Sequence, residues 1–285
     1  MRDFRFLQPD SVSSVLKVKN DERENGHILA GGTNLLSYIK FGRVKQGLLI
    51  DITRLEELRG IEETKDRVSF GACLTIRELL ESPVMQKRLP YFFETLQLFA
   101  NPLIRNKATL GGNVADASPI ADTAPILLAL DATVTAVNAK DRREIPLAEF
   151  FTGPGKTVLQ ADEIITAVNV PVYEAARVVM LKLGLRRGTA CSVTSAAVRL
   201  DLEDGQLRDL RIATGGVAPT PVRAYTCEKA MHDGRFTGAL IDEKIDALQQ
   251  DISPISDVRS TAEYRREVTE NLVKRALKSA AGMEV

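Results

Sequence analysis

The chain has 285 residues, of which 44% are hydrophobic and 27% are charged, a composition typical of a folded globular protein with room for more than one core. Lys plus Arg and Asp plus Glu each number 38, so the net charge gives no reason to expect binding to nucleic acid or to an anionic membrane. The first residues lack the apolar core of a signal peptide, and no apolar run is long enough to span a bilayer, so we expect a cytoplasmic protein. The three cysteines form no C-x-x-C pair and are expected to be buried free thiols, not zinc or iron–sulfur ligands.

The first part of the chain is expected to fold in a βαβ order. A strand over 28–30 leads through Gly31-Gly32 to a short helix that ends near Lys40, with Thr33 as its N-cap, and a second strand follows over 47–52. Helices are expected from 75 to 80 and, on apolar residues at helical spacing, from 84 to 100. A helix over 122–130, preceded by Ser118-Pro119 as a cap, and a strand over 132–138 complete this part.

Pro171 indicates a boundary, after which the pattern becomes β-rich and then helical. Strands are predicted over 178–186, 192–201 and 207–214, and Asp204-Gly205 between the last two is a strong hairpin signal. Helices are predicted over 222–231, 238–250 and 262–280. The fold class is therefore α+β: a two-lobed region over 1–171, with lobes of about 1–53 and 54–171, precedes a C-terminal sheet-plus-helices domain over 172–285.

Two glycine pairs carry the strongest functional signal. The first is Gly31-Gly32, followed by Thr33 and Asn34, and the second is Gly111-Gly112 in the stretch from Thr109 to Asp122. Glycine tolerates positive φ and lets the backbone approach a ligand, and a run of exposed N–H groups suits a phosphate. Two such turns suggest two ends or faces of one large phosphate-bearing cofactor, although neither matches the P-loop or the dinucleotide-binding G-x-G-x-x-G pattern.

In their order and spacing, these stretches resemble the FAD-binding subunit of the xanthine dehydrogenase family of molybdenum hydroxylases. Further matches are Ile104-Arg105-Asn106, Phe151-Thr152-Gly153-Pro154-Gly155-Lys156, Asp162-Glu163-Ile164-Ile165 and the stretch from Gly215 to Pro221. Asn34 departs from the Asp or His common in that family, but an amide can still donate and accept. The resemblance implies an FAD-binding region of the vanillyl-alcohol-oxidase (PCMH) type, followed by a C-terminal flavoprotein domain of the CO dehydrogenase type.

The resemblance also implies a noncovalent FAD and the residues that hold it. Ser118 and Asp122 would lie beside the ribityl and pyrophosphate groups, Phe99 would cover the isoalloxazine ring, and Ile165 and Lys182 would lie near the flavin. On the residues alone, both turns could be ordinary connections, Phe99 a core residue and Lys182 a solvated strand residue. The full predicted set is Leu29, Ala30, Gly31, Gly32, Thr33, Asn34, Leu35, Phe99, Thr109, Gly111, Gly112, Asn113, Ser118, Asp122, Ile165 and Lys182.

The predicted function is that of an FAD-carrying electron-transfer subunit, with no catalytic side chain or metal site of its own. The resemblance implies that iron–sulfur clusters and molybdopterin lie on partner subunits, that electrons leave FAD for NAD or another acceptor, and that the complex oxidises a xanthine or other purine, or an aldehyde. Two alternatives stay open: a self-contained FAD-dependent oxidoreductase and a non-enzymatic nucleotide-binding adaptor.

Overall fold

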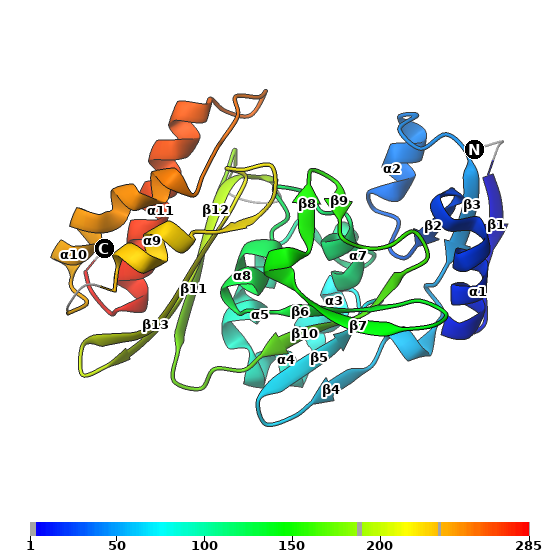
Figure 1. Cartoon of the computed structure of the whole chain (residues 1–285), viewed down its shortest axis with the longest axis horizontal. Coiled ribbons are helices and arrows are strands. Elements are labelled where there is room, and N and C mark those ends of the chain that lie inside the picture. Colours follow the sequence, from blue (N-terminus) through cyan, green and yellow to red (C-terminus); the bar gives the residue numbers. More distant parts are fainter. Residues whose placement is uncertain (1–3, 187–189, 233–234, 285) are drawn as a thin grey trace.

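The structure is a computed structural model that describes residues 4–186, 190–232 and 235–284, with the two ends of the chain at opposite ends of the molecule (Figure 1). The first lobe is a three-stranded parallel sheet of order β1-β3-β2. Its elements are β1 (Phe4–Leu7), α1 (Val12–Glu22), β2 (Gly26–Leu29), α2 (Leu35–Lys40) and β3 (Gly47–Asp51). Its core includes Val15 and Ile50, and Leu58, Cys73 and Ile164 from the second lobe join it, so the two lobes share buried surface.

The second lobe is a five-stranded antiparallel sheet of order β4-β5-β10-β6-β7 with helices packed against it. The predicted helix over 84–100 is wrong as one element, because it is two helices that meet at Leu89-Pro90. Proline has no N–H group and disfavours helical backbone in the residue before it, so the first helix ends there. The strands of this sheet are β4 (Ile61–Glu63), β5 (Arg67–Gly71), β6 (Thr133–Val137), β7 (Arg142–Pro146) and β10 (Ile164–Pro171). A separate antiparallel pair is formed by β8 (Phe151–Gly153) and β9 (Lys156–Thr157). The helices are α3 (Ile76–Glu81), α4 (Pro83–Arg88), α5 (Pro90–Gln97), α6 (Pro102–Arg105), α7 (Leu110–Ala115) and α8 (Ala124–Ala129).

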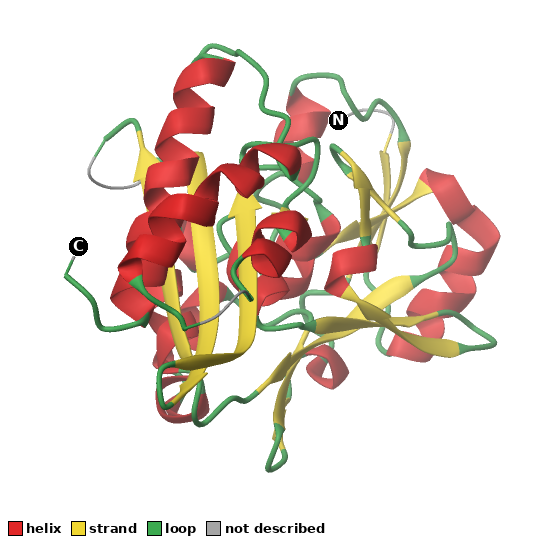
Figure 2. Ribbon diagram, turned by 60° about the vertical axis from the view of Figure 1, so that its left-hand side comes forward, coloured by secondary structure: helices red, strands yellow, loops and turns green. Residues whose placement is uncertain are grey.

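The C-terminal domain is a four-stranded antiparallel sheet of order β11-β12-β13-β14, and Figure 2 shows helices over one face of it. Along β12 the side chains alternate: Ala196 and Val198 join the core under those helices, and Ala197 joins the core of the second lobe. The predicted hairpin is confirmed, with positive φ at Asp204 and Gly205. The predicted helix over 222–231 is instead a short strand and a helix. The elements are β11 (Arg177–Gly184), β12 (Ser192–Glu203), β13 (Gln206–Gly215), β14 (Val222–Arg223), α9 (Tyr225–Ala230), α10 (Gly238–Lys244) and α11 (Ala262–Ala280).

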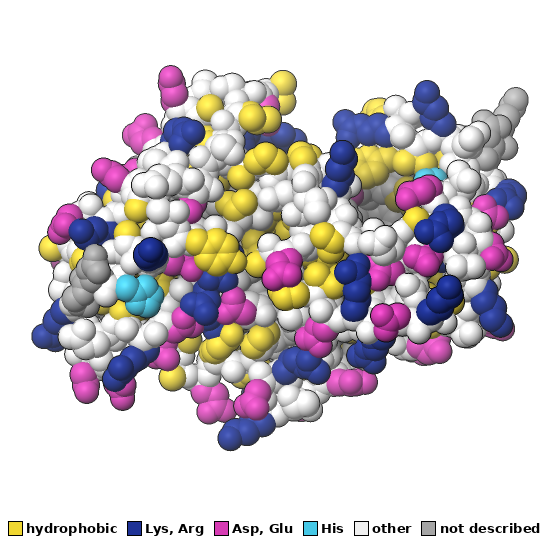
Figure 3. All heavy atoms as spheres, viewed as in Figure 1, with side chains coloured by type: hydrophobic (Ala, Val, Ile, Leu, Met, Phe, Trp, Pro, Cys, Tyr) yellow, Lys and Arg dark blue, Asp and Glu magenta, His cyan; other side chains and the backbone are white. Residues whose placement is uncertain are grey.

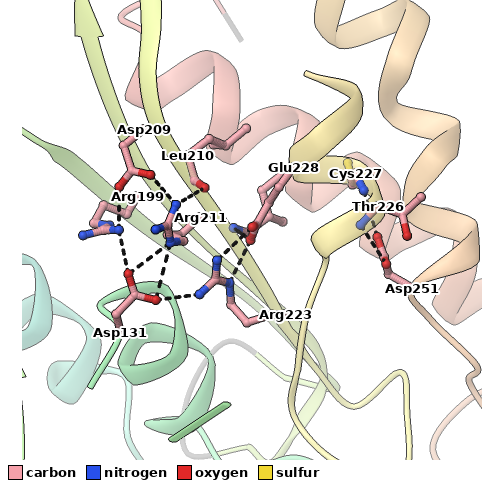
Figure 4. A network of polar contacts seen from close by, with 11 residues as sticks. Asp131, Arg199, Asp209, Leu210, Arg211, Arg223, Thr226, Cys227, Glu228 and Asp251 are labelled. Carbon is pink, nitrogen blue, oxygen red and sulfur yellow. Dashed lines mark hydrogen bonds and ion pairs between the residues drawn. The ribbon is translucent and has the colours of Figure 1, made fainter. Parts of the chain in front are cut away.

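An ion-pair network joins the second lobe to the C-terminal sheet (Figure 4). Asp131, just after α8, accepts from the guanidinium groups of Arg199, Arg211 and Arg223 at 2.8, 3.0 and 2.6 Å. Arg223 is also paired with Glu228 on α9 at 2.8 Å. Arg199 and Arg223 are almost fully buried, so solvent screens their charges less than that of a surface residue, and the network fixes the sheet against α8.

The visible surface is mixed in charge. Figure 3 shows acidic and basic side chains interspersed over this face, with hydrophobic side chains between them, in keeping with a net charge of zero. In the part of the chain that the structure describes, no helix has the length and apolar character needed to cross a membrane.

Candidate functional site

A cavity of about 650 Å³ lies where the two lobes meet, a volume within the usual range for a small-molecule or cofactor site. Every residue of the predicted set lines it except Leu29 and Lys182. Tyr38, Asn101, Ile104, Asp116, Leu159, Glu163 and Cys191 also line it and were not predicted as site residues.

The first glycine turn gives this cavity a row of backbone donors. In the described part of the chain, the N–H groups of Gly31, Gly32, Thr33 and Asn34 have no backbone carbonyl as acceptor. Gly32 has φ = +69°, which residues with a side chain rarely adopt. The predicted N-cap role of Thr33 is wrong, because α2 begins one residue later, after Asn34, and without a side-chain cap. The turn therefore presents donors that suit an anion.

The second glycine pair has a different structure from the predicted loop. Gly111, Gly112 and Asn113 lie inside α7, whose N-cap is Thr109. The Gly112 N–H donates to Thr109 Oγ1 at 3.1 Å, and the Asn113 N–H donates to the Thr109 carbonyl at 2.9 Å. The Gly111 N–H donates to the Ala72 carbonyl at 3.0 Å, so this pair is not a second row of free donors.

The glycines bring separate backbone segments into contact. A Cβ atom on Gly31 would lie 1.9 Å from the carbonyl oxygen of Lys107, just before the second glycine pair. A Cβ atom on Gly111 would lie 2.6 Å from the Cβ of Ala72. Close approach of another backbone segment therefore restricts both positions to glycine. The contact between Gly31 and Lys107 sets the two turns on adjacent walls of the cavity.

Asp116 links the two turns. Its Oδ2 accepts from Asn34 Nδ2 at 2.6 Å, and its Oδ1 accepts from the Tyr38 hydroxyl at 3.0 Å. Burial, and next the charge of Asp116, raises the pKa of Tyr38 to about 12, so the hydroxyl stays a donor at neutral pH. Asp116 could have been predicted as a site residue from the sequence, because it lies one helical turn after Gly112 in the same motif.

Asp122 and Lys182, both predicted site residues, form an ion pair at the cavity wall. Lys182 Nζ lies 2.6 Å from Asp122 Oδ2, and the Ser192 hydroxyl donates to Asp122 Oδ1 at 2.7 Å. The Lys182 side chain is only 10% exposed, so it is not a solvated strand residue. The predicted helix start is wrong here: α8 begins at Ala124, Ser118 does not cap it, and Asp122 precedes it.

The remaining predicted residues form the apolar side of the cavity. Phe99 is buried in the core of the second lobe as well as lining the cavity, and Ile165 is similarly buried. Arg105 donates to the carbonyl of Phe99 at 2.5 Å, which holds the turn after α5. Beside Ile165, Glu163 is held by Arg143 at 2.7 and 2.8 Å, and this hydrogen bonding lowers the pKa of the Glu163 carboxyl.

The cysteines are only partly as predicted. All three are free, and Cys73 and Cys227 are buried, where desolvation raises each thiol pKa to about 12. Cys191 is exposed and lines the cavity, so the prediction that it is buried is wrong. Among the described residues, no group of three or more His, Cys, Asp and Glu side chains could hold a metal ion.

Two family models match successive parts of the chain. Residues 2–173 match the FAD-binding domain in molybdopterin dehydrogenase. The chain belongs to this family. Residues 180–280 of this FAD-binding protein match the CO dehydrogenase flavoprotein C-terminal domain. The resemblance to FAD-binding subunits of molybdenum hydroxylases and the α+β fold class are thereby confirmed.

Individual relatives of the FAD-binding protein align over nearly the whole chain. It is 29% identical to the glyceraldehyde dehydrogenase medium chain of Sulfolobus acidocaldarius over 98% of this chain and 99% of that one. It is 31% identical to the putative xanthine dehydrogenase FAD-binding subunit XdhB of Escherichia coli, covering 89% of this chain and 88% of that one. The structure of carbon monoxide dehydrogenase from Hydrogenophaga pseudoflava contains a chain with a TM-score of 0.94 and 32% identity, covering 98% of each chain.

Proposed function

We propose that this protein is the FAD-carrying electron-transfer subunit of a multi-subunit molybdenum hydroxylase, and that it binds FAD noncovalently. The observation that carries the proposal is the cavity with free backbone donors on one wall, in a chain whose first 173 residues belong to an FAD-binding family. Neither His27 nor His232 lines the cavity, which supports noncovalent binding.

The lining residues fit the parts of FAD. The N–H groups from Gly31 to Asn34 would hold the pyrophosphate, because backbone donors with no internal acceptor suit an anion. Leu29, Ala30 and Leu35 flank this turn. Ser118 would exchange hydrogen bonds with the ribityl hydroxyls, and the Asp122 carboxylate would accept from them. The wall next to the first turn would be formed by Thr109, Gly111, Gly112 and Asn113.

The other end of the cavity suits a flat ring system. Phe99 and Ile165 offer apolar surface for the isoalloxazine, and Lys182 brings a positive charge behind Asp122. Bound FAD would supply a carrier that takes up two electrons and passes them on singly or as a hydride.

The source of those electrons is proposed to be an iron–sulfur subunit, itself reduced by a molybdenum-cofactor subunit. An iron–sulfur cluster needs several cysteines at one place, whereas Cys73 and Cys227 lie in different cores and Cys191 at the cavity. The similar proteins include medium chains of carbon monoxide dehydrogenase and glyceraldehyde dehydrogenase, names that fit a multi-chain enzyme. The proposed acceptor is NAD or another oxidant, and the proposed substrate of the complex is a purine or an aldehyde.

Purification of the chain from its native host with whatever binds it tests this function. We expect co-purification of chains that carry iron and molybdenum, one acid-releasable FAD per copy, and bleaching of the flavin when a purine or an aldehyde is added. The isolated chain should not hydroxylate either substrate, although it should reduce a dye with NADH if NAD is the acceptor. Hydroxylation by a metal-free, homogeneous chain would instead favour the self-contained oxidoreductase.

A further inference from the structure

Strand β12 contains a bulge that turns Ser192 towards Asp122, on the wall of the cavity. Leu183 on β11 pairs with Thr194, whereas the next residue, Gly184, pairs with Ser192, so Val193 has no partner on β11. Alternate residues of a strand point to the same face, and Thr194 faces α11, with its hydroxyl 2.6 Å from that of Thr269. A regular strand would turn Ser192 towards α11 as well. The extra residue reverses it, since a bulge redirects the side chains beside it.

Two residues enclose this bulge. Arg265 on α11 is 2% exposed, and its Nη1 donates to the carbonyl of Val193 at 2.8 Å and to that of Gly216 at 2.7 Å. Gly216 has φ = +81°, and a Cβ atom there would lie 2.6 Å from the Val193 carbonyl oxygen. The carbonyl of the bulged residue is thus satisfied by a buried charge and covered by the turn after β13.

The bulge determines how Asp122 is held. Asp122 belongs to the second lobe and lines the cavity, but both of its carboxylate oxygens are held by the C-terminal sheet. Lys182 holds Oδ2 and Ser192, fully buried, holds Oδ1. A carboxylate oxygen can accept more than one hydrogen bond, so each retains capacity for a donor in the cavity.

We propose that Ser192 and Arg265 are positioning residues for the FAD site: Arg265 holds the bulge at Val193, the bulge directs Ser192 at Asp122, and Ser192 fixes the carboxylate that meets a ribityl hydroxyl of FAD. The inference rests on the proposed function, namely that FAD occupies this cavity. The C-terminal domain thereby completes a site whose walls belong to the two lobes.

The chain offers a matched pair of serines for the test. Ser195, three residues further along β12, is equally buried, but its hydroxyl has no hydrogen-bond partner among the residues that the structure describes. Ser192→Ala and Ser195→Ala therefore remove the same atom from the same strand, and only the first removes a hydrogen bond to a charged group. The full chain is reconstituted with FAD, and the Kd, the visible circular dichroism of the flavin and the far-ultraviolet spectrum are measured for each variant.

Ser192→Ala should raise the Kd for FAD about tenfold, as expected for the loss of a hydrogen bond to a charge, and should change the visible dichroism. Ser195→Ala should match the wild type in its Kd for FAD and in the visible dichroism. The wild type and the two serine variants should have the same far-ultraviolet spectrum. Equal FAD affinity and dichroism in the two variants would overturn the positioning role. Failure of the wild-type chain to bind FAD would overturn the proposed function itself, so the two failures are distinguishable.

Arg265 is tested by a double-mutant cycle on the same readout. Arg265→Lys keeps the charge but loses the guanidinium group, whose Nη1 donates to both carbonyls while its Nη2 donates to Asp257. It should therefore weaken FAD binding in the wild-type background. If Arg265 acts through Ser192, the same substitution should have no further effect in the Ser192→Ala background. Additive effects of the two substitutions would overturn the role assigned to Arg265.

Discussion

The two glycine pairs of this protein lie on adjacent walls of one cavity, but their backbones do different things. At Gly31-Gly32 the chain leaves a strand through a residue with φ = +69°, and four successive N–H groups lack a backbone acceptor within the described ranges of the chain. At Gly111-Gly112 the chain is already helical, and the same kind of N–H groups donate to Thr109 and Ala72.

The residues before each pair explain the difference. Thr109 has a hydroxyl that accepts from the third residue after it, which begins a helix and occupies the donors. Leu29, which holds the corresponding position two residues before the first pair, has no such group, so the first turn keeps its donors for a ligand. Glycine in the first pair therefore provides donors as well as close approach, and in the second pair it provides close approach only.

The largest effect is expected from Gly31→Ala. The new Cβ would meet the Lys107 carbonyl at 1.9 Å, so the two turns must separate. We expect FAD affinity to fall about a hundredfold, since overpacking a close contact costs about 1–3 kcal/mol and 1.4 kcal/mol is tenfold. Titration with FAD checks this, with Gly60→Ala as the control because a Cβ there meets nothing within 4 Å. Wild-type FAD affinity in Gly31→Ala would show that the close approach of Gly31 to Lys107 is not needed for FAD binding.

A smaller effect is expected when the link between the turns is broken. Tyr38→Phe removes the hydroxyl that donates to Asp116, and should weaken FAD binding about fivefold, the size expected for one net hydrogen bond of about 1 kcal/mol. Because the folded pKa of Tyr38 is raised, its contribution to stability is complete below pH 10 and lost as the pH rises through about 12. Titration of tyrosinate absorbance should show one group fewer near pH 12 in the variant. An unchanged titration near pH 12 would contradict the raised pKa of Tyr38.

Thr109→Ala should separate stability from binding. It removes the N-cap of α7, which costs about 1 kcal/mol, or roughly 2–4 °C in Tm, and leaves the donors of the first turn unchanged. FAD affinity should change less than threefold, a limit of about 0.7 kcal/mol. Thr109→Ser keeps the hydroxyl and serves as the control for both quantities. A loss of FAD binding as large as that of Gly31→Ala would show that the second pair also holds the anion.

The smallest effect concerns the thiols, and it tests where FAD lies. Cys73 and Cys227 are buried with raised pKa values, so only Cys191 should react rapidly with a thiol reagent at neutral pH. Bound FAD should slow this reaction, because Cys191 lines the cavity. The rate is followed with and without FAD, and Cys191→Ser should abolish the fast phase. A fast phase unaffected by saturating FAD would place the cofactor elsewhere.

Much of the fold could be predicted from local patterns in the sequence. The helix over 262–280 matches α11, and the Asp204-Gly205 hairpin is present, because apolar periodicity and positive-φ turn residues act locally. The opening strand β1 and helix α1 were not predicted. β1 is only four residues long and mostly exposed, so its pattern is too short to indicate a strand, and pairing with β3 defines it instead.

The sequence predicted which residues line the site better than it predicted how they are arranged. The motifs identified lining residues such as Gly31 and Asp122, but not the partners that lie far away in sequence. Ser192 contacts Asp122, 70 residues away in the sequence, and this contact depends on a bulge that no local sequence pattern predicts. The contacts of each predicted residue with FAD, and the domain boundary at Pro171, stay predictions.

A crystal structure of the full chain with FAD tests the central claim most directly. The account predicts pyrophosphate oxygens within about 2.7–3.2 Å of at least two of the N–H groups from Gly31 to Asn34, with the hydrogen bonds of Thr109 to α7 intact. A pyrophosphate held away from the first turn, or one that displaces Thr109 to bind the N–H groups of Gly112 and Asn113, would contradict it.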